Sequence, residues 1–118
     1  MKLHPEELRN RTKQFAIRIV RLFRLLPKTD EARTIGRQLL RSGTSVAANY
    51  RAVCRARSKA EFIAKIGVVV EETDETVFWL ELLVDTGIVA QEKLTDLLKE
   101  ANELVAIFAA SQQTAKRR

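Results

Sequence analysis

Residues 30–57 read DEARTIGRQLLRSGTSVAANYRAVCRAR, and this stretch decides whether the chain is built from long helices or shorter ones. Gly43, Thr44 and Ser45 in its middle are typical of a loop. Apolar residues nevertheless recur at helical spacing on both sides, and their stripe keeps its phase through Gly43. The pattern therefore predicts one long helix over residues 30–57, with a bend at Gly43 allowed and a break there as the alternative. The stripe comprises Ala32, Ile35, Leu39, Gly43, Val46, Tyr50, Val53 and Cys54.

Two further helices flank this stretch. Before it, apolar residues at helical spacing stop at Pro27, which predicts a helix over residues 5–26. After it, Ser58 and Glu61 have the spacing of a capping box, in which each side chain satisfies a backbone N–H of the first turn. The capping box predicts that the next helix covers residues 58–86.

The end of the chain adds a fourth helix over residues 90–110, where leucines recur at helical spacing. Because the connections are short, consecutive helices are expected to be antiparallel. Residues 1–110 are therefore predicted to form one all-α domain, an up-down-up-down four-helix bundle. Residues 111–118 have no apolar anchor, and we expect them to be a disordered basic tail.

Composition excludes several classes of protein. With 118 residues, 46% hydrophobic and 31% charged, the chain suits one folded domain rather than a disordered segment. One Cys and one His argue against an internal disulfide and a histidine-based metal site. No apolar run suits a signal peptide or a membrane span, so a soluble, cytoplasmic protein is expected. Since no phosphate-binding glycine loop or nucleophile–base pairing is present, we expect no enzyme, no cofactor and no metal.

Charge divides the chain into two electrically opposite halves. Residues 1–60 carry 15 Lys and Arg against 4 Asp and Glu, whereas residues 61–118 carry 6 against 11. The total is +6. Such a chain can attract nucleic acid through its basic part, or pair with a second copy of itself through both parts.

Arginines on the predicted second helix form one stripe without any lysine, which favours planar, bidentate contacts to phosphate or carboxylate. Nucleic-acid backbone is one target for this stripe, and the acidic third helix of the same or a neighbouring chain is another. A third possibility is that the stripe is a solvated face that binds nothing. The arginines can also divide into two groups, with Arg41 and Arg51 in ion pairs and the outer arginines free. The predicted first helix carries further arginines. The candidate nucleic-acid-binding residues are therefore Arg11, Arg18 and Arg21 on the first helix and Arg33, Arg37, Arg41, Arg51 and Arg55 on the second.

The predicted third helix is apolar on more than one face. A single bundle of this size does not cover a helix on every side, so a second chain is expected to cover part of it. Acidic residues among these apolar positions are suited to arginines of a neighbour. The candidate oligomer-interface residues are Val68, Glu71, Glu72, Glu75, Phe78, Trp79 and Leu82.

Several segments of the sequence resemble one bacterial family of four-helix bundles. This family is named for proteins encoded by intervening sequences in large-subunit ribosomal RNA genes, is also labelled S23 ribosomal protein, and includes the accessory variability determinant of diversity-generating retroelements. The most specific similarity is over residues 41–49 and 58–62. The matching segments are Phe15, Leu26-Pro27-Lys28, Gln38-Leu39, Arg41, Ser45-Val46-Ala47, Asn49 and Ser58-Lys59-Ala60-Glu61-Phe62.

The resemblance implies a ring-like homopentamer with a basic surface and no catalytic residues. For the retroelement members it also implies a reverse transcriptase and nucleic acid as partners. Family positions matched by Arg41, Ser45, Asn49, Phe62 and Glu75 are interpreted as structural or interface positions before binding ones.

Together, these patterns predict a non-enzymatic, nucleic-acid-binding homo-oligomer, assembled through its second and third helices, that acts as a scaffold or accessory protein. No membrane partner is expected. The alternative is a protein–protein interaction scaffold whose arginines pair with Glu71, Glu72 and Glu75 of a neighbouring chain.

Overall fold

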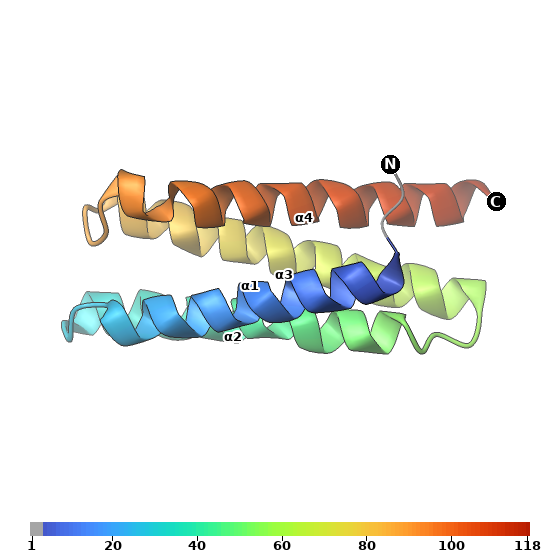
Figure 1. The fold of residues 1–118 in the computed structure, drawn as a ribbon, viewed down its shortest axis with the longest axis horizontal. Coiled ribbons are helices and arrows are strands. Elements are labelled where there is room, and N and C mark those ends of the chain that lie inside the picture. The colour runs from blue at the N-terminus through green and yellow to red at the C-terminus, as the bar shows by residue number, and fades with distance from the viewer. Residues whose placement is uncertain (1–3) are drawn as a thin grey trace.

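A computed structural model describes residues 4–118, which form four α-helices and no strand. The predicted domain starts at residue 1, and residues 1–3 lie outside this described part. Figure 1 shows the helices running along the long axis of the molecule, with the chain reversing its direction at each connection. The molecule measures 47 × 23 × 20 Å. The helices are α1 (Pro5–Leu25), α2 (Asp30–Val53), α3 (Lys59–Asp85) and α4 (Gln91–Arg117).

Helix α2 is continuous through Gly43, without the break that was its alternative. The glycine serves close packing, because a Cβ at this position would lie 2.8 Å from two side-chain carbons of Ile19 in α1. The helix ends at Val53 rather than at residue 57. The N–H of Arg55 bonds to the Ala52 carbonyl three residues back, so the chain tightens into a turn before the next helix begins.

Helix α4 extends to Arg117, which corrects the prediction of a disordered tail over residues 111–118. The amide of Gln112 donates a hydrogen bond of 3.3 Å to the Ile63 carbonyl of α3 and fastens the last turns to their neighbour. Gly67 leaves the room that this side chain occupies. The anchor is polar, so apolar spacing did not reveal it.

Three helices begin with a side-chain cap. His4 Nδ1 accepts a hydrogen bond from Glu6 N–H, Thr29 Oγ1 from Ala32 N–H, and Ser58 Oγ from Glu61 N–H. These bonds satisfy backbone donors that have no partner within the helix. The Glu61 carboxylate does not complete the capping box. It pairs instead with the Lys65 ammonium group, at 3.1 Å. At the end of α3, Gly87 has the positive φ of 76° that a left-handed cap requires.

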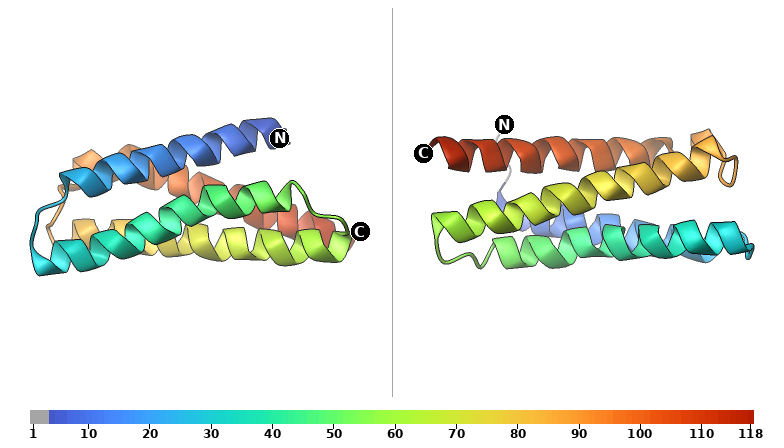
Figure 2. Two further views of the ribbon diagram at one scale, coloured as in Figure 1. Left: turned by 90° about the horizontal axis from the view of Figure 1, so that it is seen from below. Right: turned by 180° about the vertical axis from the view of Figure 1, so that it is seen from behind.

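Apolar side chains from all four helices form one core. The rings of Tyr50 and Phe108 join α2 to α4 in it, with centroids 5.3 Å apart. Consecutive helices pack closely, whereas α1 and α4 touch much less. Figure 2 shows α3 lying between α2 and α4 in its right-hand view. The contact between the first and last helices is therefore the most open part of the bundle. The side chains with at most 1% exposure include Phe15, Ile19, Leu39, Val46, Ile66, Val69, Leu80, Leu83, Leu104 and Phe108.

None of the helices in the described part of the chain combines the length and the hydropathy needed to cross a membrane.

Candidate nucleic-acid interface

Four of the predicted arginines on the second helical segment are both exposed and free of ion pairs within the described residues. Arg33, Arg37 and Arg51 lie on α2, and Arg55 lies in the turn directly after it. Within residues 4–118 none of the four forms an ion pair. Their guanidinium groups are thus available to an external anion, each with a planar set of N–H donors.

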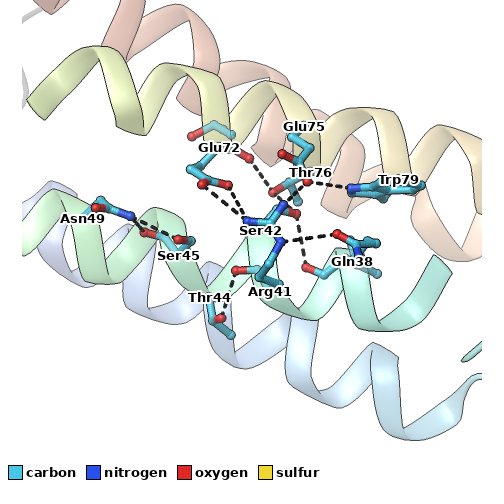
Figure 3. A network of polar contacts seen from close by, with 12 residues as sticks. Gln38, Arg41, Ser42, Thr44, Ser45, Asn49, Glu72, Glu75, Thr76 and Trp79 are labelled. Atoms are coloured by element: carbon cyan, nitrogen blue, oxygen red, sulfur yellow. Dashed lines mark hydrogen bonds and ion pairs between the residues drawn. The ribbon is translucent and has the colours of Figure 1, made fainter. Parts of the chain in front are cut away.

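Arg41 differs from its neighbours on α2, because two carboxylates of α3 already bind it. Its guanidinium lies 3.3 Å from a Glu72 oxygen and in direct contact with Glu75, and its Nε donates to Gln38. Figure 3 shows these side chains converging between the two helices, with the Trp79 N–H donating to Glu75 at 3.0 Å. The hydrogen bonds from Trp79 and Arg41 lower the pKa of the Glu75 carboxyl.

A buried hydrogen bond lies close to this ion pair. Thr76 of α3 donates to the hydroxyl of Ser42 on α2 at 2.9 Å, and both residues are fully buried. In Figure 3 the pair lies beside Arg41. This bond fixes the two helices relative to each other at the level of Arg41. This bond was not predicted, although two small polar residues within apolar helical patterns are a visible signal for such a pair.

Arg11 on α1 is also committed within the chain. It makes two hydrogen bonds to the carboxylate of Glu100, at 2.6 and 3.0 Å, and a third to Glu103 at 3.3 Å. The hydrogen bond to Glu100 is the main cause of a raised pKa of Arg11. This pairing was not predicted, although the spacing of Glu100 and Glu103 already places both carboxylates on one face of a helix.

The two remaining predicted arginines lie elsewhere on α1. Arg18 is half-buried and Arg21 is exposed, and both line a groove toward the start of α4. The structure therefore divides the eight candidates into three groups. Four are exposed and unpaired around α2, two are paired within the chain, and two border the groove. Of the split that the sequence allowed, Arg41 is paired and Arg51 is not.

The predicted interface residues lie along the outer side of α3. Val68 and Phe78 are 42% and 51% exposed, and Glu71 is exposed as well. The Phe78 ring packs edge-on against Trp79, with centroids 4.8 Å apart. Leu82 and Trp79 are half-buried. Glu72 and Glu75, expected to meet a neighbour's arginines, bind Arg41 of the same chain instead.

The chain is similar in sequence and in structure to known proteins. The model of the family described as 23S rRNA-intervening sequence protein matches residues 6–110. The chain belongs to that family. It is also similar to the crystal structure of a protein with unknown function from the S23 ribosomal protein family of Bacteroides thetaiotaomicron VPI-5482, with a TM-score of 0.85 and 31% identity. The similarity covers 92% of this chain and 97% of that one.

A search of curated proteins finds no match to the chain. The predicted resemblance to the 23S rRNA-intervening sequence protein family is confirmed, and with it the all-α, four-helix architecture.

Proposed function

We propose that this member of the family is a non-enzymatic homo-oligomer that binds the phosphate backbone of RNA or DNA. The observation that carries the proposal is the exposed, unpaired state of Arg33, Arg37, Arg51 and Arg55 within the described residues. Arg11 and Arg41 form ion pairs with carboxylates of the same chain, whereas these four arginines form none within the described residues. We define the four residues as the α2 arginines.

The spacing of the α2 arginines suits an extended polyanion. Arg33 and Arg51 are separated by about 27 Å along the helix, at 1.5 Å per residue. A row of arginines of this length can contact several phosphates of one nucleic-acid backbone. Recognition would be largely independent of sequence, because contacts to phosphates do not read the bases. Tyr50 is buried and Trp79 is half-buried and hydrogen-bonded to Glu75, so neither of these two rings is free to stack on bases.

Self-association would multiply this charge. The exposed Val68 and Phe78 on α3 support burial of that side against a second chain. The pentamer that the family resemblance implies would repeat a net charge of +6 on each protomer. A ring of such protomers would present several sets of α2 arginines to one nucleic acid, and this repetition would raise the avidity of a weak, phosphate-directed contact.

The proposal is tested by measuring binding of a DNA duplex and of a structured RNA across a salt series. Tight binding at low salt should weaken linearly in a log–log plot, since each phosphate neutralised by the protein releases counterions. For the duplex, Arg37→Gln should reduce the slope by about 0.9 for each protomer whose Arg37 guanidinium neutralises a phosphate. The matched control is Lys99→Gln, which removes one exposed charge from α4. Equal effects of the two variants would contradict a site on α2.

The second candidate function is a protein–protein interaction scaffold. It is favoured by the same exposed Val68 and Phe78, together with the pairing of Arg41 with Glu72 and Glu75. In this case the α2 arginines would meet Glu71 and other acidic residues of neighbouring chains. No retention of either nucleic acid at low salt would support this second function over the first.

A further inference from the structure

A groove of about 480 Å³ lies where the end of α1 faces the start of α4. The α1–α2 and α3–α4 connections lie at this same end of the molecule, on the left in Figure 1. The groove exists because α1 and α4 pack sparsely against each other. The ion pair between Arg11 and Glu100 joins the two helices farther along the bundle. Its volume is within the range of small-molecule sites, about 300–1,000 Å³.

The floor and one wall of the groove are apolar. Leu26, Leu94 and Leu97 are buried beneath it, and the half-buried Ile88 comes from the α3–α4 connection. Leu25 lies at the edge with 83% of its surface exposed, more than either exposed apolar residue of α3. An exposed leucine beside an apolar floor can gain free energy by covering an apolar ligand.

The rim of the groove is predominantly basic. Arg18, Arg21 and Lys93 line it, opposed by the single carboxylate of Asp96. None of these four side chains takes part in an ion pair within residues 4–118. The rim therefore carries an excess of two positive charges over an apolar floor, and a ligand that complements both properties has an anionic head and an apolar body.

We propose that this groove binds a small amphipathic carboxylate, an aliphatic monocarboxylic acid of medium chain length. The chain would lie on the leucines of the floor under Leu25, and the carboxylate would lie among Arg18, Arg21 and Lys93. Nucleic-acid backbone is a poorer complement, since phosphates and sugars leave the apolar floor unused. This site is separate from the α2 arginines, and it does not depend on the proposed function.

The experiment titrates the protein with decanoate at neutral pH, below the concentration at which decanoate forms micelles. Calorimetry gives the affinity, and methyl NMR locates the site. Saturable binding is expected, with shifts concentrated at Leu25, Leu26 and Ile88. Octanoate should bind about fourfold more weakly, because two methylene groups are removed from a half-open groove. Decanol should bind about tenfold more weakly than decanoate, because it lacks the charge that the rim recognises.

Two groove variants and one matched control test the position of the site. Arg18→Gln combined with Arg21→Gln should weaken decanoate binding about tenfold. Ala90→Trp should abolish it by filling the groove from an exposed position outside the core. Arg33→Gln combined with Arg37→Gln removes the same charge from α2, and should leave decanoate binding unchanged.

Several outcomes would overturn the proposal. One is the absence of saturable binding by the wild-type protein. Equal affinities for decanoate and decanol would refute the role of the basic rim, and equal affinities for decanoate and octanoate would refute the apolar floor. An equal loss in the α2 control would show non-specific attraction to a basic protein. If Ala90→Trp fails to fold, the pair of α1 substitutions still decides the result.

Discussion

Substituting alanine for either of two helical glycines should give different results, because the glycines face different neighbours. At Gly43 the added Cβ would lie 2.8 Å from the Cγ1 and Cγ2 atoms of Ile19, which is fully buried against α2. At Gly67 the added Cβ would also meet an atom at 2.8 Å, but that atom is the terminal amide nitrogen of Gln112. A terminal amide can rotate away, whereas the branched carbons of a packed isoleucine cannot.

The magnitudes follow from three opposing effects. Replacing glycine by alanine inside a helix stabilises it by about 1 kcal/mol. Overpacking at Gly43 costs about 1–3 kcal/mol, so Gly43→Ala should lower the free energy of unfolding by about 1 kcal/mol. Gly67→Ala sacrifices the hydrogen bond from Gln112 to Ile63, worth about 1 kcal/mol, and should leave the free energy of unfolding within about 0.5 kcal/mol of wild type.

Urea unfolding followed by helical circular dichroism measures both variants and the wild type. All three proteins are compared at one concentration, because stability depends on concentration if the chain self-associates. A Gly43→Ala variant as stable as Gly67→Ala would refute the argument. It would mean that α1 and α2 do not approach each other as closely at Gly43 as the structure has them.

Two further predictions concern α3. Because the folded-state pKa of Glu75 lies below its ordinary value of 4.5, its hydrogen bonds from Trp79 and Arg41 stabilise the protein above pH 4.5, and this stabilisation is lost as pH falls through the lowered pKa. Urea midpoints at pH 7 and pH 3 should therefore differ less in Glu75→Gln than in wild type, and an equal difference would contradict the pairing. Phe78→Asp should place a charge in the proposed contact between chains and yield smaller oligomers by light scattering; Asp74→Asn, on the same helix, is the control. An unchanged mass in Phe78→Asp would remove this side of α3 from the interface.

Much of the fold follows from the sequence because its signals are local. The stripe through Gly43 predicted a continuous α2, and the spacing of Ser58 and Glu61 located the beginning of α3. The ends of helices were harder to predict. The tight turn after Val53 and the polar anchor of Gln112 depend on neighbouring segments, and neither appears in a pattern of apolar residues.

The candidate site follows from the sequence only in part. The arginines stand out in the sequence as a group, but separating the free ones from the paired ones requires knowing which helices are neighbours. Arg11 meets Glu100 across 89 positions of sequence, and the two can be matched only once α1 lies beside α4. The groove is harder still to foresee, since it results from the separation of two helices rather than from any residue pattern.

The packing of helices in sequential order has a consequence for folding kinetics. Close packing mainly joins helices that follow one another in the chain: α1 with α2, α2 with α3, and α3 with α4. Such packing closes short loops, so the chain has the low contact order of fast-folding helical proteins. The meeting of α1 with α4 closes the longest loop and is held by the sparsest packing. Amide hydrogens on the side of α1 that faces α4 should accordingly exchange with solvent through local opening. Their exchange should be faster than that of the amide hydrogens at the centre of α3.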